Sequence, residues 1–237
     1  MREIIIDIDD SNSIKDVVNR ISEDWFSPEE IYSRLKTNGK TNSSNFWNVT
    51  MVADVAEALN LKSAQFQNKW DQRCINHDAK IMGYHCTRSS NKHSFSDKGI
   101  LPLSDETIKI NEGNLQTYDN KSMWDYRTKC KPGPFLFLSY KEAKNPNNHF
   151  CLNGPEILLA CSGHQVNSNP SNSIPLIIHC TIPYSILPEK SVYTFHILRA
   201  YFNFLDPEDD STDIVKGDAI DMKGQPIDPK YIRIEKM

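Results

Sequence analysis

The feature that most constrains the fold of this chain is a change in its hydrophobic pattern near residue 76. Before that point apolar residues recur at helical spacing, and after it they gather in short runs separated by Gly, Pro and Asn. Helices and strands space their side chains differently, so one type of element cannot extend through both parts. The sequence therefore predicts an α+β protein, with residues 1–75 as a small helical N-terminal region and residues 76–237 as a second domain.

Four helices are predicted in residues 1–75. The first can be capped at Ser13. The second has a stronger start signal, because the Ser27 side chain can accept the N–H of Glu30 while the Glu30 carboxylate reaches back, and Pro28 suits the first helical position. This second helix should stop near Asn38-Gly39. The expected inward positions of the four helices are Ile14, Val17, Val18 and Ile21; Ile31 and Leu35; Val52, Val55, Ala56 and Leu59; and Phe66 and Trp70.

Short strands are expected to make up the second domain. The candidates are short apolar, β-prone segments that are separated by clusters of Gly, Pro and Asn. They are Ile81–Thr87, Phe135–Ser139, Glu156–Cys161, Leu176–Ile182, Val192–Leu198 and Tyr231–Ile234.

Composition and charge exclude several classes of protein. The 38% hydrophobic content supports a real core, which argues against wholesale disorder. The net charge of −4 provides no global attraction for nucleic acid or an anionic membrane. No apolar run approaches the ~18 residues that a membrane span needs. The first ten residues, MREIIIDIDD, do not resemble a signal peptide, so we expect a cytoplasmic protein with six reduced cysteines.

The most informative stretch is Gly83-Tyr84-His85-Cys86-Thr87-Arg88, which ends a predicted strand. It leads through Ser89–Lys98 into Gly99-Ile100-Leu101-Pro102-Leu103. Taken alone, His85 is compatible with a buried, hydrogen-bonded core histidine. The order of strand, His-x-Thr-Arg, short helix and Gly-Ile-Leu-Pro-Leu resembles the opening motif of the ADP-ribosyltransferase superfamily.

Two later stretches extend this resemblance. Pro134–Tyr140 looks like the second motif, a hydrophobic strand that ends in Ser or Tyr, and Phe150–Leu158 looks like the third, in which Glu156 opens a strand. The three motifs occur in the family's order. They are similar to those of His-Tyr-Glu members, in the poly(ADP-ribose)-polymerase-like and diphtheria-toxin-like branch. The resemblance implies a split β-sheet domain that uses NAD as co-substrate.

The resemblance also implies roles for individual residues in NAD cleavage. Breaking the bond between nicotinamide and ribose develops positive charge on the ribose, much as in glycoside cleavage. Glu156 would bind the ribose 2′-hydroxyl and stabilise that charge, which makes it the catalytic candidate. An aromatic ring would stack on the nicotinamide. Tyr140 is the candidate for this, but Ser139 could instead face the cleft, because adjacent strand residues point to opposite sides.

The first motif would supply the other contacts with NAD. By resemblance, His85 would hydrogen-bond the adenosine ribose, with the Thr87 hydroxyl assisting. The backbone around Cys86 would pair with the nicotinamide carboxamide, and Arg88 could hold a phosphate. Members that modify arginine or asparagine commonly carry Glu or Gln two positions before the catalytic Glu. Here that position is Gly154, which disfavours arginine as the acceptor.

The leading hypothesis is therefore an NAD-dependent ADP-ribosyltransferase that acts on an unidentified protein or nucleic-acid acceptor. Stand-alone transferases of this kind fit an intracellular toxin, defence or modifying enzyme. One alternative is a non-catalytic module that binds NAD, ADP-ribose or a protein partner on a degenerate transferase fold. Another is an RNA 2′-phosphotransferase-like enzyme, although the cluster of cleft arginines that such enzymes use is not apparent.

The sequence contains two weaker patterns. Cys74-x-x-His77 and Cys161-x-x-His164 each resemble half of a zinc site, but chance placement is the better interpretation, and no metal is predicted. The segment Val52–Leu61 and the basic residues after it resemble a helix-turn-helix layout that could bind DNA. A helical bundle packed on, or steering, the catalytic domain is favoured over that reading.

Overall fold

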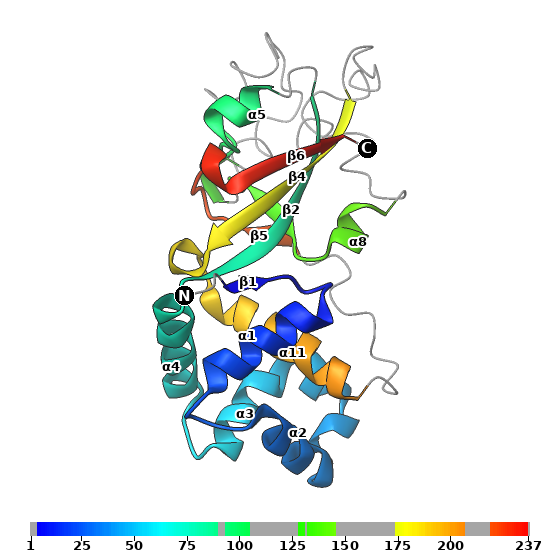
Figure 1. The fold of residues 1–237 in the computed structure, drawn as a ribbon, viewed down its shortest axis with the longest axis vertical. Coiled ribbons are helices and arrows are strands. Elements are labelled where there is room, and N and C mark those ends of the chain that lie inside the picture. Colours follow the sequence, from blue (N-terminus) through cyan, green and yellow to red (C-terminus); the bar gives the residue numbers. More distant parts are fainter. Residues whose placement is uncertain are drawn as a thin grey trace. The chain divides into compact units, whose positions relative to one another are not determined.

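The computed structural model describes residues 4–89, 93–104, 128–130, 132–145, 174–206 and 219–236 (Figure 1). Over these residues the protein combines N-terminal helices with a six-stranded, mostly antiparallel sheet, so the predicted α+β class is confirmed. No helix in the described part of the chain is both long enough and apolar enough to cross a membrane.

The chain forms two compact units that are not consecutive in sequence. Unit 1 comprises Met1–Met82 and Pro183–Lys216, and unit 2 comprises Gly83–Ile182 and Gly217–Met237. The predicted domain boundary at residue 76 lies close to Gly83, where the chain first passes from unit 1 into unit 2. The segment from Pro183, assigned above to the second domain, instead belongs with the N-terminal helices.

Unit 1 begins with a short strand that the sequence analysis missed. Strand β1 (Ile4–Ile6) pairs in parallel with the first residues of β2 (Ala79–Ser89). Helix α1 (Ser11–Ser22) follows, and its N-cap is Asp10, whose carboxylate accepts the N–H of Asn12 at 2.9 Å. The expected cap at Ser13 was wrong, because that hydroxyl donates to a carbonyl of β1 instead.

Helix α2 (Pro28–Thr37) starts where the sequence predicts. The Ser27 hydroxyl accepts the N–H of Glu30 at 3.2 Å, and Pro28 occupies the first turn. The helix ends at Thr37 with Asn38 as its C-cap, and Gly39 follows with a φ of 70°, a left-handed conformation that glycine adopts without strain. Both predicted ends are therefore confirmed.

The remaining N-terminal helices are α3 (Met51–Ala58) and α4 (Ser63–Asn76). They are preceded by a short 3-10 helix, η1 (Lys40–Asn42), and a short π-helix, η2 (Phe46–Thr50). Helix α4 ends at Asn76, at the end of the predicted helical region 1–75. Its expected apolar residues Phe66 and Trp70 are fully buried, as are Val55 and Ala56 of α3.

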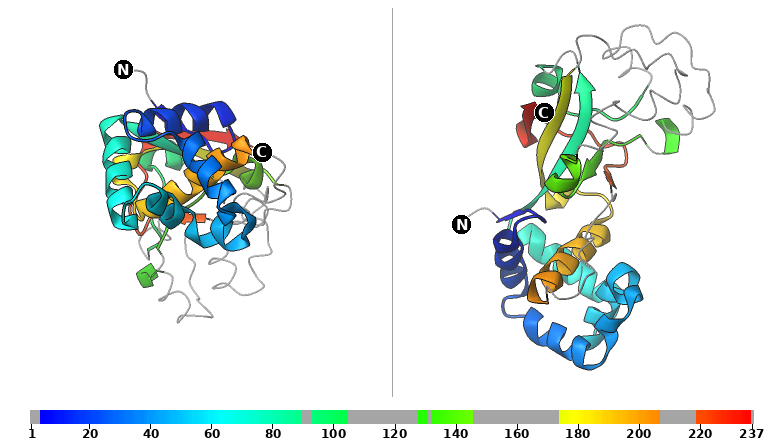
Figure 2. Two further views of the ribbon diagram at one scale, coloured as in Figure 1. Left: turned by 90° about the horizontal axis from the view of Figure 1, so that it is seen from below. Right: turned by 90° about the vertical axis from the view of Figure 1, so that its right-hand side faces the viewer.

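The predicted strand Val192–Leu198 is wrong, because these residues lie within helix α11 (Lys190–Leu205). Buried residues occur on nearly every side of α11, which packs against α1, α3 and α4. Figure 2 shows it in orange beside α1 and next to the other helices of unit 1. A helix buried on most sides has no polar stripe to reveal its period, so the β-branched and aromatic residues suggested a strand.

The strand order of the sheet is β5-β3-β2-β4-β6, with β1 pairing separately with β2 (Figure 1). The strands not yet given are β3 (Phe135–Phe137), β4 (Ile174–Pro183), β5 (Ala219–Asp221) and β6 (Ile232–Lys236). Strand β3 pairs antiparallel with β2 and β5, and β4 pairs antiparallel with β6. The strands predicted around β2, β3, β4 and β6 are confirmed, β5 was missed, and Glu156–Cys161 lies outside the described residues.

The segment after β2 contains the predicted short helix, α5 (His93–Lys98). Gly99 follows it with a φ of 74°, and Ile100 exchanges two 2.9 Å backbone hydrogen bonds with Ile227. A Cβ at Gly99 would lie 1.9 Å from the Ile227 carbonyl oxygen, so only glycine fits. The Gly-Ile element of the first motif thus has a structural role next to the short turn η5 (Pro229–Tyr231).

Candidate functional site

The sheet of unit 2 presents two chemically different faces. The His179 ring on β4 lies 5.3 Å from that of Tyr84 on β2, so these residues share a face. Arg233 and Glu235 of β6 share it too, because Arg233 pairs directly with His179 and Glu235 with the residue two before it. We call this the Glu235 face. Strand alternation places His85, Ile232 and Ile234 on the other side, the His85 face.

A group of polar side chains surrounds the carboxylate of Glu235, and we call Tyr140, Lys144, His179, Arg233 and Glu235 the Glu235 cluster. The Tyr140 hydroxyl donates to Oε1 of Glu235 at 2.7 Å. Nε2 of His179 lies 2.6 Å from Oε2 of the same carboxylate. Each carboxylate oxygen therefore has a hydrogen-bond partner, and the Glu235 side chain is still 28% exposed.

Two cations complete the cluster. Nζ of Lys144 donates to the Tyr140 hydroxyl at 3.1 Å and lies 3.8 Å from Oε1 of Glu235. Nη2 of Arg233 lies 3.1 Å from Nδ1 of His179. Hydrogen bonds from Tyr140 and His179 lower the pKa of Glu235 below its ordinary value, outweighing the effect of burial. The carboxylate is accordingly ionised at neutral pH.

Local sequence explains how Tyr140 reaches this position. The Ser139 hydroxyl accepts the N–H of Glu142 at 3.2 Å and so caps the short helix α8 (Tyr140–Ala143). The cap ends the strand early, at Phe137 rather than at the predicted Ser139, and makes Tyr140 the first helical residue. Because Ser139 is buried in this cap, it is Tyr140 that joins the cluster.

Aromatic rings support the cluster from within the sheet. The rings of Tyr84, Tyr140 and His179 lie 5.3 Å apart in each pair, and Tyr84 is buried. Such spacing is typical of favourable aromatic contacts. Only Tyr140 is supplied by a helix, so these contacts fix the start of α8 against β2 and β4.

The first motif is divided between the two faces. Nδ1 of His85 lies 2.9 Å from the Phe135 carbonyl oxygen, and removal of the ring from water lowers its pKa. The Cys86 thiol donates to the Ala143 carbonyl at 3.4 Å, on the α8 side. Thr87 is buried. Arg88 belongs to β2, but its side chain lies outside what the structure describes.

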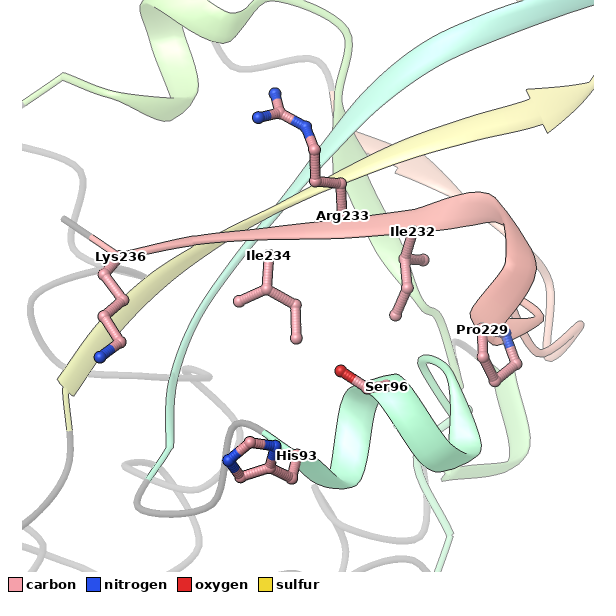
Figure 3. Close-up of a pocket in the computed structure, with 7 residues that line it drawn as sticks. All are labelled: His93, Ser96, Pro229, Ile232, Arg233, Ile234 and Lys236. Carbon is pink, nitrogen blue, oxygen red and sulfur yellow. The ribbon is translucent and has the colours of Figure 1, made fainter.

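A pocket of about 420 Å³ lies on the His85 face, between α5 and β6 (Figure 3). Figure 3 shows Ile232 and Ile234 on the pocket side of β6 and Arg233 on the opposite side. Its described lining contains no carboxylate. The lining residues are His93, Ser96, Pro229, Ile232, Arg233, Ile234 and Lys236.

The structure brings together only part of the predicted site. Tyr140 and His85 belong to opposite faces of the sheet, so they do not converge as the resemblance implied. Glu156 lies outside the described residues, and its predicted catalytic role stays a prediction. Among the described residues, no group of three or more His, Cys, Asp or Glu side chains is arranged to hold a metal ion.

Sequence reasoning missed Lys144, His179, Arg233 and Glu235. A signal was present, because His179 interrupts the apolar strand LIIHCTI, and Arg233 and Glu235 alternate with isoleucines in β6. Period-two alternation places two charges on one face but does not say which strand lies beside it. No family model, curated protein or solved structure matches this chain. Any function must therefore be inferred from its residues.

Proposed function

We propose that this protein is an NAD-dependent ADP-ribosyltransferase in which Glu235 is the carboxylate that assists bond cleavage. The observation that carries the proposal is the pair of contacts on the Glu235 carboxylate. The Tyr140 hydroxyl lies 2.7 Å from Oε1, and Nε2 of His179 lies 2.6 Å from Oε2. The site thus contains a histidine and a tyrosine that both contact the partly exposed carboxylate of a glutamate. The histidine and glutamate differ from those that the sequence motifs suggested.

The ionisation state of Glu235 suits this reaction. When the bond between ribose C1 and the nicotinamide nitrogen breaks, its electron pair leaves with nicotinamide and positive charge develops on the ribose. A fixed carboxylate stabilises that charge and accepts a hydrogen bond from a ribose hydroxyl. A lowered pKa keeps Glu235 ionised for this task. An acceptor atom then bonds to C1 and releases its proton to solvent.

Other groups of the cluster suit the rest of NAD. Lys144 is exposed, and its ammonium is available to pair with the pyrophosphate while it stays near the Tyr140 ring. The Tyr140 ring gives the nicotinamide an aromatic neighbour. The exposed guanidinium of Arg233 has further donors beyond the one it uses on His179. These groups recognise a dinucleotide through its charge and its flat ring.

The motif order adds support that is independent of the cluster. Strand β2 with His85, helix α5 and the Gly99-Ile100 turn follow one another in the described chain as the resemblance requires. In the proposal Cys86 and Arg88 keep their implied roles in binding NAD. The roles implied for His85 and Thr87 are not used, because strand alternation places both residues on the opposite face of the sheet from the Glu235 cluster. The acceptor is an unidentified protein or nucleic acid.

Nicotinamide release from NAD, measured with the purified full chain and cell lysate as the source of acceptor, tests the proposal. Glu235→Gln keeps the size of the side chain but removes its charge, so we expect turnover to fall by roughly 100-fold or more. Glu30→Gln, at an exposed position of α2, is the matched control and should leave turnover unchanged.

The outcomes distinguish a catalytic role of Glu235 from a catalytic role of Glu156. Normal turnover in Glu235→Gln, with loss in Glu156→Gln, would return the catalytic role to Glu156 and make the Glu235 cluster structural. Loss in both variants while each keeps the wild-type circular dichroism would place both carboxylates in the reaction. Absence of nicotinamide release from the wild type across several lysates would overturn the proposed enzyme activity.

The pocket on the His85 face favours one second candidate, a non-catalytic nucleotide-binding module. Its volume lies within the usual range for small-molecule sites, and Lys236 and His93 give it a basic, carboxylate-free lining among the described residues. This candidate predicts that ADP-ribose binds to the wild type without chemistry. Lys236→Glu should then weaken binding while Glu235→Gln does not, as measured by isothermal titration calorimetry.

A further inference from the structure

His179 lies between an arginine and a carboxylate, and this arrangement determines where its proton resides. A guanidinium can only donate hydrogen bonds, so Nδ1 of His179, 3.1 Å from Nη2 of Arg233, must act as the acceptor. An ionised carboxylate can only accept, so Nε2, 2.6 Å from Oε2 of Glu235, must carry the hydrogen. Together the two contacts specify the neutral Nε2–H tautomer.

Packing keeps the ring in this orientation. The His179 side chain is 10% exposed and lies 5.3 Å from the rings of both Tyr84 and Tyr140. The opposing residue on β6 is Arg233, and Glu235 is two residues further along the same strand. The register of β6 against β4 therefore places the donor, Arg233, and the acceptor, Glu235, beside the two ring nitrogens of His179.

We infer that Arg233 and His179 are positioning residues that fix the Glu235 carboxylate, with His179 locked as an Nε2–H donor. A proton added at Nδ1 would displace the Arg233 hydrogen bond and set two cations against each other. His179 therefore does not remove the proton of the acceptor. Its role is to hold one carboxylate oxygen while Tyr140 holds the other. The catalytic consequence rests on the proposed function, but the tautomer does not.

Nitrogen-15 NMR of the histidine rings in the full chain tests the inference directly. At about pH 8, well above the ~6.5 of an ordinary histidine, Nε2 of His179 should resonate as a protonated nitrogen and Nδ1 as an unprotonated one. His85 is an internal contrast. A carbonyl only accepts, so the 2.9 Å contact with Phe135 predicts the opposite, Nδ1–H tautomer there.

Two variants complete the spectroscopic test. His179→Gln removes one set of ring signals and so assigns it. Arg233→Met should shift the Nδ1 resonance of His179, because that nitrogen loses its donor, and should leave His85 unchanged. A protonated Nδ1 on His179, or no shift in Arg233→Met, would overturn the inference.

Nicotinamide release then tests the positioning role. An amide has both a donor and an acceptor, so His179→Gln should keep most of the activity. His179→Leu should lose about tenfold, the effect of losing one hydrogen bond to a charged group. Equal activity in both variants would contradict the positioning role. If the wild type releases no nicotinamide, the proposed function fails while the NMR result still decides the tautomer.

Discussion

At the scale of single residues, the Glu235 cluster shows how one carboxylate can be kept charged and oriented without burying it completely. Tyr140 and His179 each donate to a different oxygen of Glu235, and Lys144 lies nearby. These partners favour the charged form, so the folded protein binds a proton at Glu235 less readily than the unfolded chain does. The ionised state of Glu235 and its pH-dependent contribution to stability therefore have the same cause.

This linkage predicts how stability depends on pH. A lowered pKa in the folded state stabilises the fold above the ordinary carboxylate value of 4.5, and this contribution is lost as the pH falls through the lower, folded value. The Glu235→Gln variant has no ionisable carboxyl group at this position, so it lacks this pH-dependent contribution. The difference in free energy of unfolding between wild type and Glu235→Gln should thus be largest near neutral pH and shrink below about pH 4.5.

Urea denaturation followed by tryptophan fluorescence over a series of pH values measures this difference. Glu30→Gln, whose side chain is exposed on α2, is the control. A difference between wild type and Glu235→Gln that stays constant down to the acid end of the series would contradict the predicted linkage.

At the scale of elements, boundaries were well predicted where a local signal determines them. Helix α2 begins at the cap that Ser27 provides and ends before Gly39, both of which act within one turn. In α11 no such local signal decides the structure. Three of its polar residues, Thr194, His196 and Asn203, are buried along with most of the apolar ones, so the helical period is hidden.

The N-cap of α2 predicts how much the Ser27 side chain contributes to the free energy of unfolding. Ser27→Ala removes the side-chain acceptor for the N–H of Glu30 and should lower the free energy of unfolding by about 1 kcal/mol. Ser33→Ala, at an exposed position inside the same helix, should change it by no more than a few tenths of a kcal/mol. Urea denaturation compares the two. Equal effects of both variants would show that the cap contributes nothing.

At the scale of the whole molecule, the order of segments in the chain differs from their grouping into units. The chain returns to unit 1 at Pro183, and α11 then supplies a large part of the core around which α1, α3 and α4 pack. Side chains such as Ile197, Leu198 and Phe202 of α11 are fully buried. Without α11, the N-terminal helices would expose to water the apolar faces that pack against these α11 side chains.

We therefore expect a fragment of residues 1–82 not to fold cooperatively. Without α11 it should show reduced helical circular dichroism and no sharp urea transition. Joining residues 1–82 to 183–206 through a flexible Gly/Ser linker restores the missing helix and should restore both. Cooperative unfolding of the 1–82 fragment by itself would contradict the division into units described above.

The sequence by itself determined the α+β class, helices α1 to α4, and the strand–helix–glycine order around His85, because periodicity, caps and turns act over a few residues. Only the tertiary structure decided that residues 190–205 are a helix and that His179, Arg233 and Glu235 lie beside Tyr140. The first depends on burial by neighbouring helices, and the second on the register of β6 against β4. Both are contacts between residues far apart in the chain, which a local pattern does not encode.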